Sequence, residues 1–497
     1  MEHYTEFLPI SRADMEARGW DQLDFVVVGG DAYVDHPSFG TAIISRLLEA
    51  EGYKIGVLAQ PRYTDCEDFK RFGKPKYGFF IGGGNVDSMV SHYSVAKIPR
   101  AEDEYSPGGR GGARPDRSAT VYTRLAKQAY PDLPVILGGL EASLRRFAHY
   151  DYWDDKVRRP ILFDAPADLL VYGMGETATK EIARRLSQKV PVGDITDVRG
   201  TAFIASDPAK CIYRPVTVPS YESVREDKKA YAEATKLQYD ENDPIRGCGV
   251  VQPCEGRYLI ANPPQRPLPR EELDRLYDLP FVREVHPMYK EPVPAIEEVR
   301  FSIAHNRGCF GGCNFCALTF HQGRMVTSRS IESVVREAEI LTEDPQFKGY
   351  IHDVGGPTAN FRHASCAGQK KHGCCKNHSC LAPEPCKNLD ADHSEYTELL
   401  RRLRKLPKVK KVFVRSGIRY DYMLQDKNQD FFRELVNYHI SGQLKVAPEH
   451  CVASVLDYMG KPHFDVFEKF WRKYQKLNEA DHKEQYLVPY LMSSHPG

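Results

Sequence analysis

Short apolar runs alternate with amphipathic segments through the first part of the chain. A run without polar positions, such as 25–30, is typical of a strand that is buried on both faces of a parallel sheet. We expect strands at 25–30, 54–58, 77–81, 134–139 and 168–173, separated by helices at 41–50, 119–129 and 176–188. This alternation predicts an α/β fold in which residues 1–206 form a Rossmann-like, doubly wound domain.

The same alternation resumes after residue 298. We expect strands at 299–304, 349–354, 411–414, 443–449 and 486–492, and helices at 331–341, 394–406, 429–438, 453–459 and 465–477. Five such β/α units over 299–497 predict a partial TIM barrel, with its chemistry at the carboxyl ends of the strands. A barrel that stops after a fifth strand has an open edge, so we expect further chain beyond Gly497.

Residues 207–298 do not follow this pattern. They are charged, rich in proline and weakly periodic, with one helical segment at 221–237. We therefore predict an extended linker that packs on its neighbours.

A loop at 106–118 is rich in glycine and arginine. Its three arginines have the chemistry to clamp a phosphate or carboxylate, although a flexible solvated loop is the simpler interpretation. Because no G-x-G-x-x-G follows the first strand, we do not expect a dinucleotide site. The glycines at the ends of other strands either approach a cofactor or simply end the strands tightly.

Three cysteines, Cys309, Cys313 and Cys316, stand at C-x3-C-x2-C spacing in the loop after the strand at 299–304. Three thiolates on one short loop can hold three irons of a [4Fe–4S] cluster and leave the fourth iron open. A zinc knuckle usually pairs its cysteines as C-x2-C twice, and ferredoxin spacing brings a fourth cysteine close by. The spacing therefore favours an iron–sulfur cluster with one exchangeable position.

The composition limits which binding partners and which cellular compartment we expect. Lys+Arg and Asp+Glu both total 68 in 497 residues, so no global charge favours a nucleic acid. No apolar run approaches a membrane span, and the first six residues have no secretory pattern. Thirteen cysteines in such a long chain indicate metal ligands rather than disulfides. We expect a cytoplasmic protein without a membrane partner.

A cysteine-rich insertion interrupts the second half at 361–393. Cys366, Cys375, Cys380 and Cys386 lie within it and predict a second metal centre, either zinc or an auxiliary Fe–S cluster. Redox-active cysteines or plain loop cysteines are the alternatives, and His372, His378 and His393 are alternative ligands. A basic run at 401–411 could face RNA, but a solvated helix face explains it more simply.

The cysteine spacing, with Phe315 before the third cysteine, resembles the signature of radical S-adenosylmethionine (SAM) enzymes. Several runs further resemble the YgiQ-type radical SAM family, over nearly the whole chain. They are Gly138–Arg146, His149–Trp153, Arg307–Cys309, Gly355–Asn360 and Ala447–His450. The resemblance implies a [4Fe–4S] cluster on Cys309, Cys313 and Cys316, with SAM on the open iron.

The resemblance also suggests where SAM lies. The segment Gly355-Gly356-Pro357-Thr358 occupies the place of the family's Gly-Gly-Glu motif, with Pro357 replacing the glutamate that contacts the SAM amino group. Ser416, Arg419 and Glu449 are further candidates for contacts to SAM. The first domain resembles a cobalamin-binding domain, but the Asp-x-His-x-x-Gly cobalt motif is absent because Asp35 and His36 are adjacent. We therefore do not expect cobalamin.

These features imply an enzyme that cleaves SAM reductively to methionine and a 5′-deoxyadenosyl radical, with flavodoxin or ferredoxin as the electron donor. The catalytic residues and the substrate do not follow from the sequence. One alternative is a radical methyltransferase or methylthiotransferase that acts on RNA. Another is a non-catalytic Fe–S redox sensor or scaffold.

Overall fold

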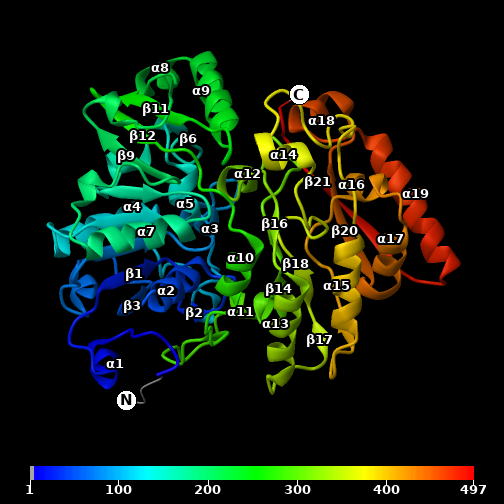
Figure 1. The fold of residues 1–497 in the computed structure, drawn as a ribbon, viewed down its shortest axis with the longest axis horizontal. Coiled ribbons are helices and arrows are strands. Elements are labelled where there is room, and N and C mark those ends of the chain that lie inside the picture. Colours follow the sequence, from blue (N-terminus) through cyan, green and yellow to red (C-terminus); the bar gives the residue numbers. More distant parts are fainter. Residues whose placement is uncertain (1–4, 497) are drawn as a thin grey trace. The chain divides into compact units, whose positions relative to one another are not determined.

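The chain divides into two compact units, and each has its own buried hydrophobic residues. Figure 1 shows the helices and strands of both. The computed structural model describes residues 5–496, so Met1–Tyr4 and Gly497, on which the predictions about a leader and a continuing chain partly rest, lie outside it. The first unit contains Met1–Arg266 and Leu279–Arg300, and the second contains Pro267–Asp278 and Phe301–Gly497.

The first unit is built on a sheet that has nine strands within the described residues, in the order β10-β11-β12-β9-β8-β5-β4-β1-β3. Five neighbouring strands form a continuous parallel run: β3 (Ile55–Ala59), β1 (Phe25–Gly29), β4 (Gly78–Gly82), β5 (Val135–Gly138) and β8 (Leu169–Val171). Counted along the chain, these five have the order 2-1-3-4-5 of a doubly wound fold. The predicted α/β, Rossmann-like architecture is thus confirmed.

Helices cover both faces of this sheet because its strands are apolar on both sides. In β1, Val26 and Val28 pack with α4 (Ser118–Ala129) in one core. Phe25 and Val27 pack on the other face with α2 (Gly40–Ala50) and α7 (Glu176–Ser187). A strand buried between two helical layers needs this uninterrupted apolar run.

The region predicted as a linker at 207–298 instead contributes largely to the sheet. Strands β10 (Pro215–Thr217), β11 (Gly249–Cys254) and β12 (Arg257–Ala261) extend it past β9 (Thr201–Ala205), and β12 pairs antiparallel with both β11 and β9. The polar Gln252 interrupts the apolar run of β11, so the sequence pattern did not predict this strand. Its amide is buried but satisfied, since Nε2 donates to Pro219 O at 3.1 Å and Oε1 accepts from Ala148 N at 2.8 Å.

The remaining short elements of the first unit surround this sheet. The helices are α1 (Arg12–Ala17), α3 (Ser88–His92), α5 (Gly139–Leu144), α6 (Ile161–Asp164), α8 (Tyr221–Glu226), α9 (Lys228–Glu241) and α11 (Ala295–Val299). The strands are β2 (Val34–Asp35), β6 (His149–Asp151), β7 (Lys156–Arg158) and β13 (Glu284–Val285).

The carboxyl ends of β1 and β4, where doubly wound folds bind ligands, are occupied by a buried ion-pair network. Arg114 is 1% exposed, and its guanidinium pairs with Asp31 at 3.0 Å and with Asp103 at 2.7 Å. The other two arginines of the loop at 106–118 have partners elsewhere: Arg110 pairs with Glu291, and Arg117 with Asp151. The three arginines therefore do not form a joint phosphate clamp.

The second unit alternates strands and helices, as predicted. Its parallel pairs are β14 (Ser302–Ala304) with β18 (Asp353–Gly355), β17 (Tyr350–Ile351) with β19 (Lys411–Val412), and β20 (Gln443–Glu449) with β21 (Tyr486–Leu491). Its helices include α10 (Arg270–Tyr277), α13 (Ile331–Glu343), α15 (Ser394–Arg404), α16 (Tyr420–Gln425), α17 (Asp430–Glu434), α18 (Ala453–Met459) and α19 (Phe464–Ala480). A π-helical turn, Leu435–His439, continues α17.

Among the described residues, no helix is long and apolar enough to cross a membrane.

We expect Arg114→Ala to lower the free energy of unfolding of the first unit by about 3–5 kcal/mol, because Asp31 and Asp103 would stay buried without a cation. Arg110→Ala, in the same loop, is the control. Its guanidinium is 70% exposed, so this substitution should change little. Urea unfolding of both variants tests the difference, and equal losses would contradict it.

Candidate functional site

The cysteine loop leaves the strand β14 and is tied down at several points. It begins with β15 (Asn306–Arg307), which pairs antiparallel with β16 (Thr327–Ser328). Cys309 N donates to Gly323 O at 3.0 Å, and Asn314 N donates to Met459 O at 2.9 Å. Cys316 then occupies the position directly before the short helix α12 (Ala317–His321). These contacts fix the loop between two segments distant in the sequence.

The three thiols of this loop lie within electrostatic reach of one another. Burial raises the pKa of Cys309 and of Cys316. The Cys313 thiol adds to both rises, and Cys309 adds to that of Cys316. Cys309 Sγ lies 3.3 Å from Thr358 Oγ1, and Arg419 Nη1 donates to Cys313 Sγ at 3.3 Å. All thirteen cysteines of the described chain are free of disulfides.

Within residues 5–496, no three Cys, His, Asp or Glu side chains stand where they could hold a single metal ion. A four-iron cluster makes a different demand, because each thiolate binds a separate iron. Its thiolates must therefore stand farther apart than the ligands of one zinc ion. Three partly buried thiols on one loop, with Thr358 and Arg419 as hydrogen-bonding neighbours, fit the donor set of such a cluster.

Arg419 is buried beside Cys313 and is held from two sides. Its guanidinium makes a bidentate pair with Asp421, with Nε 2.8 Å from Oδ1. Although burial opposes ionisation, this pair keeps the pKa of Asp421 below its usual range. Asn360 Oδ1 accepts from the backbone N–H of Arg419 at 2.8 Å. The residue predicted to contact SAM thus directs its guanidinium to Asp421 and Cys313.

A buried relay holds Asn360 in turn. Asn360 Nδ2 donates to His393 Nε2 at 3.0 Å, and His393 Nδ1 donates to Asp426 at 2.7 Å. Three successive side chains therefore fix the backbone of Arg419. His393, named above as an alternative metal ligand, uses both ring nitrogens in this relay.

The predicted SAM segment at 355–358 packs tightly against other parts of the second unit. A Cβ on Gly355 would overlap Ser416 Oγ, and one on Gly356 would overlap Asn306 Oδ1. Both glycines therefore allow close packing against neighbouring side chains that a Cβ would prevent. Ser416 is bound to Asp353 through both its hydroxyl and its N–H. Pro357 remains partly buried between Gly356 and Thr358.

Asn306 is a residue that the sequence analysis missed. Its Nδ2 donates to Thr358 O at 2.8 Å and also to Phe361 O, while its buried Oδ1 has no hydrogen-bond partner. A buried unpaired acceptor is costly and points to an absent donor. In the sequence, the feature that could have indicated a role for Asn306 is its position directly after a predicted strand and before the cysteines.

Glu449 stands at the end of β20 with a left-handed backbone, φ +71°, which is strained for a residue other than glycine. Burial raises the pKa of Glu449. Lys461, also missed from the sequence, lies 4.0 Å from its carboxylate and donates to Ala447 O at 2.6 Å. Burial, followed by the nearby Arg419, lowers the pKa of Lys461. Buried charges therefore surround the end of β20.

The insertion brings its cysteines together. Cys366 caps the helix α14 (Ala367–His372), and Cys386 N donates to Cys380 O at 3.0 Å. Burial raises the pKa of Cys380, and the three thiols that add to this rise are Cys366, Cys386 and Cys375. The other three cysteines predicted from the sequence thus lie near Cys380. The fifth, Cys374, accepts from Gln369 Nε2 at 3.2 Å.

The basic run at 401–411 is largely neutralised by carboxylates. Arg401 and Arg404 pair with Glu434, Arg402 pairs with Glu332, and Lys408 pairs with Glu343. These four cations are paired, whereas Lys405, Lys410 and Lys411 are exposed.

Comparison with known proteins places these features in context. Residues 7–302 match the family described as Radical SAM N-terminal. A UPF0313 protein of Clostridium botulinum (strain Loch Maree / Type A3) is 57% identical over 494 residues, which cover 99% of this chain and 76% of that protein. A UPF0313 protein of Clostridium perfringens (strain SM101 / Type A) is 54% identical over 495 residues, covering 99% of this chain and 75% of that protein.

Among solved structures, the radical SAM methyltransferase TsrM from Kitasatospora setae, with cobalamin and a [4Fe-4S] cluster bound, superposes with a TM-score of 0.51. The identity is 16%, and the match covers 96% of this chain and 68% of that chain. A second TsrM structure, with tryptophan and the SAM analogue aza-SAM, gives a TM-score of 0.50 at 15% identity and covers 95% of this chain and 68% of that one. This likeness concerns the fold.

We expect Arg419→Met to destabilise the second unit by about 3–5 kcal/mol, because Asp421 would remain buried without its partner. The double variant Arg419→Met/Asp421→Leu should recover much of that loss, since it removes both charges together. Urea unfolding under anaerobic conditions measures both variants. A double variant that is less stable than the single one would show that the ion pair is not the cause.

Proposed function

Since the chain belongs to the UPF0313 family and carries the radical SAM N-terminal region, we propose that it is a radical SAM enzyme. In this proposal Cys309, Cys313 and Cys316 hold a [4Fe–4S] cluster. The observation that carries it is the position of Cys313, whose thiol accepts from the buried guanidinium of Arg419. This contact places a buried cationic donor directly at a proposed cluster ligand, as the outer-shell partners of metal ligands do.

With SAM bound, such a cluster supplies one electron that splits SAM into methionine and a 5′-deoxyadenosyl radical. Flavodoxin or ferredoxin would provide that electron. The residues of the chain hold SAM and exclude water. Support comes from the two TsrM structures, which share the fold and contain a [4Fe-4S] cluster in one case and a SAM analogue in the other.

We assign the SAM amino group to Asn306 Oδ1. This atom is a buried acceptor without a partner, next to the Gly355–Gly356 backbone. An ammonium donor would satisfy it where Pro357 cannot act as the family's glutamate does. Thr358, beside Cys309, and Glu449, with its raised pKa, are the remaining polar candidates for contacts to SAM.

Replacing Cys313 with Ala should abolish the absorbance of the reconstituted cluster and the formation of 5′-deoxyadenosine from SAM and dithionite. Cys451→Ala is the matched control, because Cys451 is exposed and belongs to neither cysteine group. Liquid chromatography of anaerobic reactions measures 5′-deoxyadenosine. A cluster-loaded wild-type chain that forms none would favour the redox sensor, whereas full activity of Cys313→Ala would refute the assignment of the ligands.

We also propose a second metal centre on Cys366, Cys375, Cys380 and Cys386. Three thiols within electrostatic reach of Cys380 on a polar insertion, together with Cys380 itself, match a zinc or Fe–S donor set. A metal often brings its own ligands into position when it binds, so the thiols need not be at ligand distance from one another in the metal-free chain.

Cys380→Ser should remove this second metal without affecting the first cluster. Metal analysis would then show a loss of zinc if the centre is a zinc site, or of iron and sulfide if it is an auxiliary cluster. Cys374→Ser, in the same insertion, should retain the full metal content. Equal metal content in Cys380→Ser and the wild type would contradict the second centre.

A further inference from the structure

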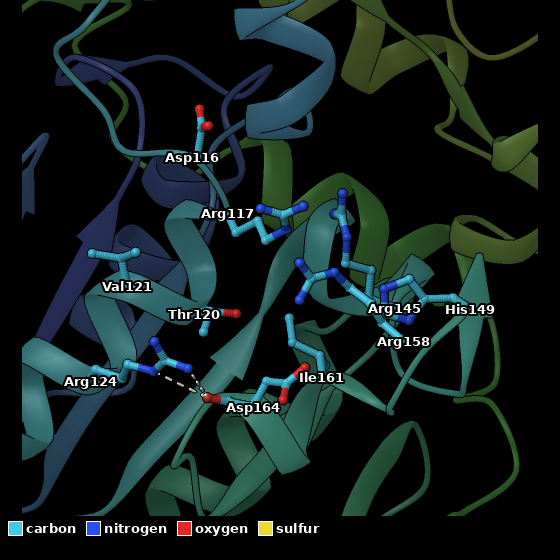
Figure 2. A pocket seen from close by; sticks show the side chains of 10 residues that line it. All are labelled: Asp116, Arg117, Thr120, Val121, Arg124, Arg145, His149, Arg158, Ile161 and Asp164. Atoms are coloured by element: carbon cyan, nitrogen blue, oxygen red, sulfur yellow. Dashed lines mark hydrogen bonds between the residues drawn. The ribbon is translucent and has the colours of Figure 1, made fainter. Parts of the chain in front are cut away.

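A cavity of about 280 Å³ lies in the first unit, outside the cysteine site. Helix α4, the end of α5, the hairpin β6–β7 and α6 contribute to its lining, and its polar residues include four arginines. These are Arg117, Arg124, Arg145 and Arg158. Figure 2 shows that the side chains of Arg117, Arg145 and Arg158 extend into the same space. The lining is therefore rich in cationic hydrogen-bond donors.

Carboxylates outside the cavity hold these arginines in position. Asp151 accepts from Arg117 Nη2 at 2.8 Å and lies 2.8 Å from Arg158 Nε. Asp87 accepts from Arg145 Nη2 at 3.0 Å. Such support fixes a guanidinium before a ligand arrives, which lowers the entropy cost of binding.

Each of the four guanidinium groups keeps one nitrogen without a partner among the described residues. The free atoms are Nη1 of Arg117, Arg124 and Arg158, and Nε of Arg145. The two aspartates of the lining are engaged elsewhere. Asp116 pairs with His92 at 2.7 Å, and Asp164 pairs with Arg159. Donors therefore remain available to an anion.

His149 adds one acceptor to the lining. It is the cross-strand partner of Arg158 in the hairpin, so both side chains lie on the same face. Its Nδ1 lies 3.0 Å from Phe147 O and must donate, because a carbonyl only accepts. Burial lowers the pKa of His149 to about 4, so the ring is neutral near pH 7. Its buried Nε2 is then an unprotonated acceptor without a hydrogen-bond partner.

We propose that this cavity binds a small hydroxylated phosphomonoester, with its phosphate on the arginines and a hydroxyl on His149 Nε2. Donors from three separate elements surround a tetrahedral phosphate better than a planar carboxylate, which one bidentate guanidinium already satisfies. Val121 and Ile161 provide an apolar wall for the short carbon skeleton. The volume is at the small end of ligand pockets, which excludes large cofactors. This site is independent of the proposed SAM chemistry.

Isothermal titration calorimetry on the full chain tests the proposal with glycerol 3-phosphate as the probe. We expect a dissociation constant below about 1 mM for glycerol 3-phosphate. Glycerol, which lacks the anion, should not bind, and malate, a hydroxylated dicarboxylate, should bind at least about ten-fold more weakly. No binding of glycerol 3-phosphate, or tighter binding of malate, would overturn the assignment.

Two arginine variants separate the cavity from general surface charge. Arg124→Gln should weaken binding by about ten-fold or more, because it removes one charge-assisted donor. Arg184→Gln, at an exposed arginine of α7 that pairs with Glu181, should leave binding unchanged. Equal weakening in both would refute the site. His149→Phe should also weaken binding, and circular dichroism would verify its fold.

Discussion

The architecture of the second unit around its cysteines depends on the burial of the Arg419 guanidinium. A charged group of this size is stable inside a protein only when its donors have partners. Asp421 satisfies two of them, and the Cys313 thiol accepts a third hydrogen bond. The side chain of Arg419 thus couples the loop after β14 to helix α16, which begins at the next residue.

The backbone of Arg419 is also held in place by hydrogen bonds. Asn360 bridges it to His393, and His393 reaches Asp426, so segments near residues 313, 360, 393 and 420 share one hydrogen-bonded network. Such a network is sensitive to the loss of any one side chain, because its former partners stay buried without a hydrogen bond. The proposed cofactor site would gain rigidity from this network, because none of the described cysteines forms a disulfide.

The sequence pattern predicted strands and helices correctly where the apolar runs were unbroken. It missed strands in which a polar residue is buried. The run at 25–30 gave β1 because every residue of that strand is buried. By contrast β11 includes a buried glutamine and a proline, so its place in the sheet depends on partners far along the chain. Motif spacing located Cys309, Cys313 and Cys316, but the roles of Asn306 and Lys461 arise only from tertiary packing.

In the proposed SAM site, Pro357 stands where the resemblance to radical SAM enzymes implies a glutamate. Proline has no N–H and no acceptor side chain, so position 357 cannot contribute an amino-group contact through its side chain. Asn306 uses both Nδ2 hydrogens on carbonyls of the following turn, at Thr358 and Phe361. These two bonds orient its Oδ1 toward Gly356, where it has no protein donor. In the proposed site, an acceptor held in this way would meet the same physical need as that carboxylate, although a neutral group binds an ammonium less strongly.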